Sequence, residues 1–560
     1  MAVPPIQRSQ QPAAADSAGS IEAARFAWLP DVVLGLLIVA ALPLAIVSIP
    51  NTVSVVGNLL PVDIDKLGLI RAHGLALPAM MLTVPLAAVA VRRTKAAPIM
   101  VGGLALLAVA DAAGGYAGSA FLVGLLRVLH GVGAGLLIPA TLVAAWDRTP
   151  VLRALWAGML AVSLLAAQAM ALWPLDNVTA WQITLQPYPV LSGVSLGLAA
   201  VYLALWLTRG SPGVPGPEPV ERSRLALSVV PAAGIAILAV GTTYNWPEHM
   251  VVLAALLSVV ALLALASIGT FEGPSGRSLA YAMVAVGVVL LPTAAQITNV
   301  ELGGLGGPGL SGLWAPFLIS GVGAVLAAVV VSRLDLGSMQ LLSGAGLVAI
   351  VLGMCAVRLM VPVAQGLLLV VPFLLLAVGA AVALTAALRV AGIGASLFGL
   401  SLCFPGVLGG YLLGTGVQVS WLRRATSPQE LVDAFVSALH LWALIGGFLV
   451  VAVIVLAAVL ARRSAGRTAL ADLAAGTAGA GGGEERHGGT GEASWSVAAR
   501  SPGVAGSDAA AGREKGAEGP ERARRLAGRE DKLVGGQGES TGPMPVVPQP
   551  AQSPEDSAAT

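Results

Sequence analysis

The feature that most constrains this 560-residue chain is its succession of apolar stretches, each about 20 residues long and separated by short polar segments. A helix of about 20 apolar residues crosses the hydrocarbon core of a bilayer. The composition agrees, because 56% of the residues are hydrophobic and 11% are charged, whereas soluble proteins are about 25% charged. We therefore expect an all-α, polytopic membrane protein with about 14 transmembrane helices.

The spacing of the polar segments groups the apolar stretches as six, two and six. Prolines and glycines concentrate just after Arg209, where they mark a linker. Both ends of the chain have few apolar clusters and are expected to be disordered. The predicted order is a cytoplasmic tail at 1–27, a six-helix bundle at 28–209, a cytoplasmic linker at 210–224, a two-helix insertion at 225–270, a six-helix bundle at 271–463 and a cytoplasmic tail at 464–560.

Basic residues indicate the orientation. If the N-terminus is cytoplasmic, most of the basic residues between the apolar stretches fall on the cytoplasmic side, as the positive-inside rule expects. The residues on that side are Arg92, Arg93, Lys95, Arg148, Arg153, Arg209, Arg222, Arg224, Arg277, Arg333, Arg389, Arg462 and Arg463. The exceptions are Lys66, Arg71, Arg358, Arg423 and Arg424. We expect a multi-pass protein of the cell membrane with both termini in the cytoplasm.

Several function classes lack their sequence signals. There is no phosphate-binding G-x-x-x-x-G-K-[ST] segment and no H-E-x-x-H. Cys355 and Cys403 lie inside apolar stretches with no metal-ligand spacing, and the net charge of +2 does not suggest nucleic acid. We therefore predict no enzyme, no cofactor and no metal. Asn177-Val-Thr179 matches a glycosylation pattern, but that pattern is too common to carry weight.

One arginine, Arg127, lies inside the fourth apolar stretch. A charge within a bilayer costs at least about 2.5–3.5 kcal/mol, so it normally faces a bundle interior or a watery cavity and has a partner. Gly131, Gly133 and Gly135 follow it, then Pro139, and the glycines form a smooth strip that lets a neighbouring helix approach. Two interpretations remain open. The helix is a gating or substrate-cavity helix, or Arg127 reaches outward from the helix end and the glycines serve ordinary packing.

Asp111 and His130 are the candidates for proton coupling. Asp111 lies inside the third stretch, and antiparallel packing places it at a depth similar to that of Arg127, so the two are predicted to form a switchable pair. A static ion pair is the alternative. His130 lies one turn from Arg127, and imidazoles titrate near pH 6.5, although a histidine at such a position is more often hydrogen-bonded packing.

Two glutamines inside apolar stretches are candidates for substrate binding. Gln168 and Gln296 provide uncharged donors and acceptors that can orient a small molecule. Either glutamine can instead join neighbouring helices. Trp156 and Trp173 lie near predicted span ends, where the membrane interface favours tryptophan.

The order of these segments resembles the major facilitator superfamily, and specifically its 14-helix drug:proton antiporter group. The resemblance is carried by Arg127-x-x-x-Gly131-x-Gly133, by the segment Trp181–Pro189 and by Gly394-Ala-Ser396, and it extends over roughly residues 28–463. It implies two six-helix bundles around a central cavity, alternating access, and proton-driven export of a small amphipathic compound. The implied partners are the lipid bilayer, a small-molecule substrate and protons.

The sequence also departs from that group. The loop after the second span keeps only the basic end of the family's gating motif, Arg92 and Arg93, and lacks its aspartate. The equivalent loop of the second half keeps Arg333 and Asp335. Helix five lacks the exporters' G-P-x-x-G-G signature. Two alternatives therefore remain, namely a transporter-like membrane protein that binds a ligand or partner without transport, and an uptake carrier.

Overall fold

The computed structural model describes residues 28–60, 65–175, 180–209, 216, 218–242, 246–268, 273–302, 309–363, 365–423 and 425–480. The predicted tail at 1–27, the glycosylation pattern at Asn177 and most of the predicted C-terminal tail lie outside the described residues. Within the described residues there are helices and no strands, so the all-α prediction is confirmed. Fourteen of these spans are long and apolar enough to cross a membrane.

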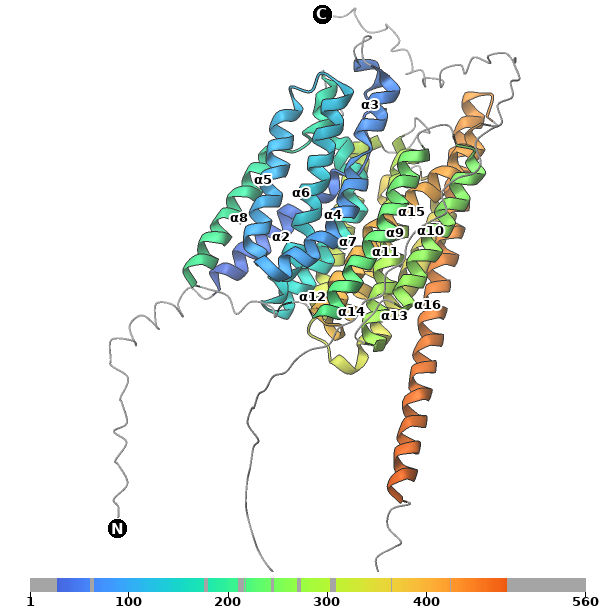
Figure 1. The fold of residues 1–560 in the computed structure, drawn as a ribbon. Coiled ribbons are helices and arrows are strands. Elements are labelled where there is room, and N and C mark those ends of the chain that lie inside the picture. Colours follow the sequence, from blue (N-terminus) through green and yellow to red (C-terminus); the bar gives the residue numbers. More distant parts are fainter. Residues whose placement is uncertain are drawn as a thin grey trace, which may run out of the picture. The chain divides into compact units, whose positions relative to one another are not determined.

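The long helices follow one another along the chain with short connections (Figure 1). The first half holds α2 (Leu29–Val47), α3 (Lys66–His73), α4 (Ala76–Thr94), α5 (Ala96–Gly114), α6 (Ala120–Trp146), α7 (Pro150–Leu172) and α8 (Pro189–Arg209). The central pair is α9 (Pro219–Thr242) and α10 (Glu248–Ile268). The second half holds α11 (Gly273–Leu302), α12 (Gly309–Val331), α13 (Met339–Met360), α14 (Val370–Val390), α15 (Ile393–Leu422) and α16 (Pro428–Ala480).

Short 3₁₀ helices occupy several connections. They are η1 (Gly57–Leu59), η2 (Trp173–Leu175), η3 (Trp181–Leu185), η4 (Leu336–Ser338) and η5 (Gly366–Leu369). The helices α3 and α4 together make the second membrane-length span, with a break at Gly74 and Leu75. Tight 3₁₀ turns suit such connections because they satisfy backbone groups in a few residues.

The helices pack into two bundles. In the first, α6 packs against α4 and α5, and α2 packs against α7 and α8; in the second, α11 packs against α15 and α16, and α14 packs against α12 and α13. The bundles meet where α7 contacts α12 and α14, and where α4 contacts α15. Both bundles lie in one contact unit, 1–483.

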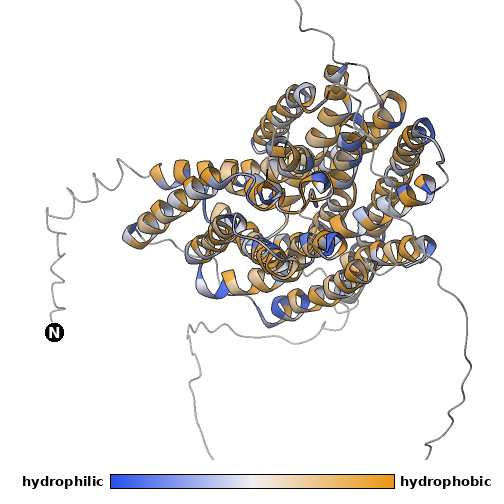
Figure 2. Ribbon diagram, turned by 90° about the horizontal axis from the view of Figure 1, so that it is seen from above, coloured by the Kyte–Doolittle hydropathy of each residue, from blue (hydrophilic) through white to orange (hydrophobic). Residues whose placement is uncertain are grey.

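Burial differs strongly among helices that are almost equally apolar. The spans of α11 and α15 are each 94% buried, whereas that of α8 is 22% buried. Hydrophobic residues dominate all the helices (Figure 2). A helix that is apolar all round lies either inside a large core or against lipid. We therefore place α11 and α15 in the interior and α8 at the lipid-facing surface.

Three predicted features differ in the structure. The helix α9 begins at Pro219, inside the expected linker at 210–224. The last helix continues to Ala480, so the expected boundary after Arg463 falls within α16. The Trp156 side chain is fully buried and its Nε1 donates to Thr141 Oγ1 at 3.0 Å, so this tryptophan belongs to the core and not to the membrane interface.

The two ends of the bundles have different chemistry. We call the end that carries Arg92, Arg148, Arg153 and Arg389 the basic end, because these residues lie in or next to the connections on that side. At the opposite end, a separate hydrophobic cluster joins the connections near η1, η2 and η3. The candidate residues described below fall at one or other of these ends.

Candidate functional site

Arg127 is buried in the first bundle with 2% of its surface exposed. Its Nε donates to His73 O at 2.9 Å, and its Nη2 donates to Ser48 O and to Pro50 O. His73 ends α3, and Ser48 follows the last residue of α2. Carbonyl groups at a helix C-terminus have no partner within the helix and carry partial negative charge. The guanidinium therefore caps two helices at once, and that accounts for a charge inside the bundle.

Asp111, His130 and Ser192 form a hydrogen-bonded cluster of three buried side chains from α5, α6 and α8. His130 Nε2 lies 2.9 Å from Asp111 Oδ1. The Ser192 hydroxyl donates to Asp111 Oδ2. The helices α6 and α8 thus each contribute one polar group to the carboxyl of α5, and the cluster lies inside the first bundle near the end opposite the basic end.

The contact of the second ring nitrogen of His130 indicates which protons the His130–Asp111 pair holds. His130 Nδ1 lies 2.8 Å from Leu126 O. A carbonyl oxygen only accepts, so Nδ1 carries a hydrogen. One further proton then lies between Nε2 and Asp111 Oδ1, either as imidazolium with carboxylate or as neutral imidazole with carboxylic acid. The pair holds this proton with no net charge, and losing it leaves one negative charge one turn from Arg127.

The predicted direct pair of Asp111 and Arg127 is not formed. Arg127 donates to backbone carbonyls, while Asp111 is bonded by His130 and Ser192. Asp111, on α5, is bonded by side chains of α6 and α8, whereas Arg127, on α6, is bonded to carbonyls at the ends of α3 and α2. Their roles in proton coupling stay a prediction.

The glycines after Arg127 serve two helix contacts. A Cβ on Gly131 would lie 2.2 Å from Ala76 O, and one on Gly135 would lie 2.6 Å from Thr83 Cβ, so both glycines face α4. A Cβ on Gly133 would lie 2.7 Å from Gly103 O, on α5. Two of the three glycines thus pack against α4 and one packs against α5. Pro139 lies buried further along α6. Such close approach is the use of small residues between membrane helices.

At the basic end, one ion pair connects the first bundle to the central helices. Arg92 Nη1, at the end of α4, lies 2.6 Å from Glu221 Oε1, in the first turn of α9. A Cβ on Gly394 would lie 2.9 Å from the Glu221 Cδ, so this carboxylate also lies against the first turn of α15. Glu221 thus touches both bundles and supplies a carboxylate beside the basic loop that lacks its own.

The other predicted gating residues are exposed. Arg93, Arg333 and Asp335 lie at the surface of the basic end. The loop of Arg333 and Asp335 is held instead by Arg389, whose Nη1 donates to Val331 O at 2.9 Å and to Leu334 O. Their gating role stays a prediction, and the geometry favours Arg92 among the four residues.

Aromatic side chains join the bundles at the opposite end. The Trp173 ring, in η2 after α7, meets the Phe317 ring of α12 edge-on, with centroids 6.3 Å apart. Phe317 stacks on Phe373 of α14 at 4.5 Å. Trp173 Nε1 also donates to Leu310 O at 3.4 Å. This contact crosses from the first bundle to the second, at the end remote from Arg92.

The two predicted substrate residues lie in the interior. Gln168 on α7 and Gln296 on α11 are buried. Gln296 Nε2 lies within 2.3 Å of the position that a Cβ on Gly414 would take, so it faces α15. Beside it, Trp442 Nε1 donates to Thr293 Oγ1 at 2.9 Å. The structure places Gln296 in a polar cluster within the second bundle, and the substrate role of both glutamines stays a prediction.

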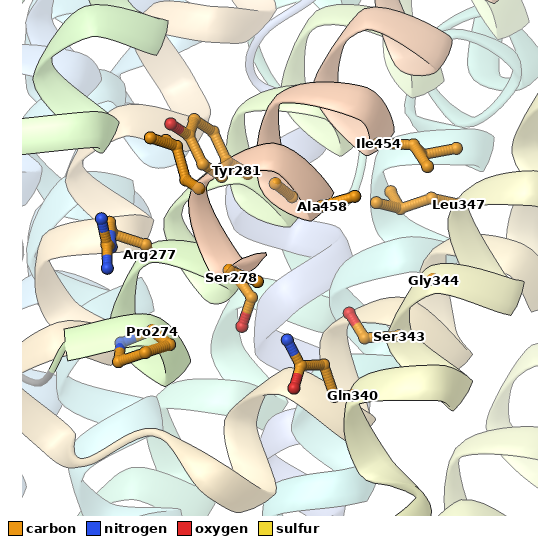
Figure 3. Close-up of a pocket in the computed structure, with 13 residues that line it drawn as sticks. Pro274, Arg277, Ser278, Tyr281, Gln340, Ser343, Gly344, Leu347, Ile454 and Ala458 are labelled. Carbon is orange, nitrogen blue, oxygen red and sulfur yellow. The ribbon is translucent and has the colours of Figure 1, made fainter. Parts of the chain in front are cut away.

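Two cavities lie at the basic end. One of about 190 Å³ lies within the second bundle between α11, α13 and α16, and is lined by Arg277, Tyr281, Gln340 and Ser343 among others (Figure 3). The other, of about 230 Å³, lies between α7 of the first bundle and α14 of the second. Gln168 and Gln296 line neither cavity. Among the described residues, no group of three His, Cys, Asp or Glu side chains is arranged to hold a metal ion.

Sequence reasoning missed three polar residues of these sites. They are Ser192 near the start of α8, Glu221 inside the expected linker at 210–224, and Glu301 near the end of α11. Glu301 is 2% exposed, and its Oε1 accepts from Val363 N at 3.2 Å. The position of Glu221 just after a proline-rich stretch was a weak indication that a helix begins there, because helices often carry acidic residues in their first turn.

Comparison with known proteins gives likenesses of fold only. No family model matches the sequence, and no curated protein matches it. The human organic anion transporter MFSD10 superposes with a TM-score of 0.47 at 14% identity, over 75% of this chain and 99% of that chain. A bacterial homologue of the human lysosomal transporter Spinster, inward-facing and unoccupied, gives 0.46 at 14% identity, over 77% and 96%. The major facilitator superfamily proton:xylose symporter XylE, bound to 6-bromo-6-deoxy-D-glucose, gives 0.44 at 13% identity, over 75% and 94%.

Proposed function

We propose that this protein is a secondary active transporter of the major facilitator type, which exports a small amphipathic compound in exchange for protons. The observation that carries the proposal is the buried, hydrogen-bonded Asp111–His130 pair, in which His130 lies one helical turn from Arg127 on α6. An ionisable residue inside a membrane span is by default a candidate for a substrate pathway or a proton relay.

Two interbundle contacts provide the gates for alternating access. At the basic end the contact is Arg92 with Glu221 against Gly394, and at the opposite end it is Trp173 with Phe317 and Phe373. Rocking of the bundles about the α7–α12 and α4–α15 contacts breaks one contact while the other stays closed. The substrate is then accessible from one side of the membrane at a time. We place the basic end in the cytoplasm, from the positive-inside rule.

Proton exchange changes the charge of the Asp111 cluster while Arg127 stays charged. With its shared proton the pair is neutral, and without it the pair is negative beside a fixed cation. The deprotonated pair therefore attracts Arg127, which holds the ends of α2 and α3. A shift of Arg127 toward Asp111 releases those helix ends, so proton loss and helix movement are linked. Each pH unit across the membrane supplies about 1.4 kcal/mol per proton for this step.

The substrate contacts that we propose are two buried glutamines. Gln168 and Gln296 are the uncharged polar groups of α7 and α11, two helices that contact each other where the bundles meet. An otherwise apolar interior with a few amide groups suits a small amphipathic compound. We place the protein in the cell membrane, with protons and one such compound as its partners.

The experiment is accumulation of a panel of fluorescent cationic and neutral dyes in cells that express the protein. We expect lower accumulation than in control cells, and we expect a protonophore to abolish the difference. Asp111→Asn and His130→Gln remove the shared proton but keep hydrogen-bonding side chains, and both are expected to abolish the difference. His440→Gln is the matched control, since His440 Nε2 bonds only Val361 O among the described residues.

Other outcomes separate the alternatives. Higher accumulation that depends on the pH gradient indicates an uptake carrier. Unchanged accumulation across the panel, together with no counterflow of any bound dye in proteoliposomes, indicates a binding protein without transport. Export that survives Asp111→Asn contradicts the assignment of proton coupling to this pair.

A further inference from the structure

The cavity between the two bundles at the basic end has an unusual lining. Its walls are Pro150, Arg153 and Ala154 from α7, Leu336 from η4, and Thr385, Leu388 and Arg389 from α14. Two of these side chains are guanidinium groups, and none of the described residues that line the cavity is a carboxylate. Two like charges therefore face one space of about 230 Å³, one from each bundle.

Neither arginine is neutralised within the described residues. Arg389 donates through Nη1 to Val331 O and Leu334 O, which are uncharged backbone groups. Arg153 lies over the Trp146 ring, with its Cζ 4.9 Å from the ring centroid, and its buried Nε has no hydrogen-bond partner in the described part of the chain. These contacts fix the position of both guanidinium groups, but no carboxylate of the described residues pairs with either charge.

A hydroxyl in the same cavity also lacks a partner. Thr385 is 2% exposed, and within the described residues its Oγ1 has no hydrogen-bond partner. Serine and threonine hydroxyls inside helices commonly bond a carbonyl of the preceding turn, as Ser401 does in α15. Leaving a buried hydroxyl unpaired is unfavourable. The cavity thus presents donors from Arg153, Arg389 and Thr385.

We infer that this cavity binds one phosphate-type oxyanion, which bridges α7 of the first bundle and α14 of the second. Guanidinium groups present parallel N–H donors that match the oxygens of a tetrahedral oxyanion, and the Thr385 hydroxyl donates to a further oxygen. The bound anion offsets the repulsion between Arg153 and Arg389 and holds the basic end closed. The phosphate belongs either to free inorganic phosphate or to the headgroup of an anionic lipid.

The test measures binding, and it does not depend on the proposed transport function. Purified, delipidated full-length protein is titrated with inorganic phosphate at constant ionic strength, with chloride as the compensating anion, while its melting temperature is recorded. A ligand that binds only the folded state raises the melting temperature with concentration. We expect such a rise for the wild type, and a smaller or absent rise for Arg153→Gln. Arg333→Gln removes one exposed arginine at the same end and is expected to keep the wild-type response.

Thr385→Val keeps the test decisive if Arg153→Gln fails to fold. This substitution removes the unpaired hydroxyl with little change of volume, so it is expected to raise the melting temperature without phosphate and to weaken the phosphate response. A purely structural threonine would give the first effect without the second, and that result would overturn the proposal.

A second arm identifies the source of the phosphate. The same variants are reconstituted in nanodiscs of phosphatidylcholine with or without phosphatidylglycerol. Stabilisation by phosphatidylglycerol that is lost in Arg153→Gln, without a response to inorganic phosphate, assigns the site to a lipid headgroup. A response to inorganic phosphate alone assigns it to the free ion. Equal responses of wild type, Arg153→Gln and Arg333→Gln in both arms, or no response in either, contradict the site.

Discussion

Alanine substitution of Arg92 and Glu221, singly and together, tests the gate at the basic end. The two side chains are 5% and 12% exposed, and their closest N and O atoms are 2.6 Å apart. Hydrogen bonds to charged groups contribute about 1.5–3 kcal/mol. Removing one partner of a buried pair costs about 3–5 kcal/mol, because the other charge is left uncompensated. The double variant should therefore lose less stability than the sum of the single variants, by about 1.5–3 kcal/mol.

A second pair in the same protein is the matched control. Arg148 and Asp31 are 24% and 30% exposed, and their closest atoms are 3.3 Å apart. Exposed pairs of this kind contribute about 0.2–1 kcal/mol. For the double-mutant cycles of both pairs, the assay measures the free energy of unfolding in mixed micelles. It is obtained from reversible unfolding at increasing concentrations of a denaturing detergent. Equal coupling energies for the two pairs would refute the argument that burial makes the Arg92 contact the stronger one.

Three further predictions concern stability. Gly131→Ala should be strongly destabilising because its Cβ would lie 2.2 Å from a backbone oxygen of α4. The control Gly102→Ala, whose Cβ meets nothing within 4 Å, should be neutral or stabilise by up to about 1 kcal/mol. Thermal unfolding compares the two variants. Arg127→Ala should cost about 3 kcal/mol or more, since three buried carbonyls lose a donor, and Arg93→Ala should change stability by no more than about 0.5 kcal/mol. Burial raises the pKa of Asp147 above its ordinary 3.8, against the opposing effect of nearby basic residues, so the ionised form disfavours folding. Asp147→Asn should then raise the unfolding free energy at pH 7, and the gain should disappear as the pH falls below 3.8; a gain that grows in acid would contradict this sign.

The number of spans and their six-two-six order followed from hydrophobic length, because the bilayer sets that length for every helix independently of its neighbours. The need of Arg127 for partners followed in the same way, from the cost of a charge in lipid. The identity of those partners did not follow. They are the backbone carbonyls of His73, Ser48 and Pro50. Because every residue has a backbone carbonyl, the sequence does not show which of them lie beside Arg127.

Asp111 is bonded by a residue other than the expected Arg127, for a related reason. Arg127 and His130 lie three residues apart and are neighbours on one side of α6, and the sequence does not say which of the two side chains meets Asp111 on α5. In the structure it is His130 that meets Asp111. Glu221 was missed because it belongs to the central helices, whose packing against α4 and α15 depends on the fold of both bundles.

Transport driven by a pH gradient in proteoliposomes tests the central claim most directly. The dye that expressing cells exclude best is given to vesicles containing wild-type protein, Asp111→Asn or the control His440→Gln, with an imposed gradient of one pH unit. Exchange of one proton for one neutral dye molecule allows the wild type and the control to concentrate the dye about tenfold at equilibrium. The account predicts that Asp111→Asn equilibrates or excludes the dye but does not concentrate it. Concentration by Asp111→Asn equal to that of the wild type would contradict the account.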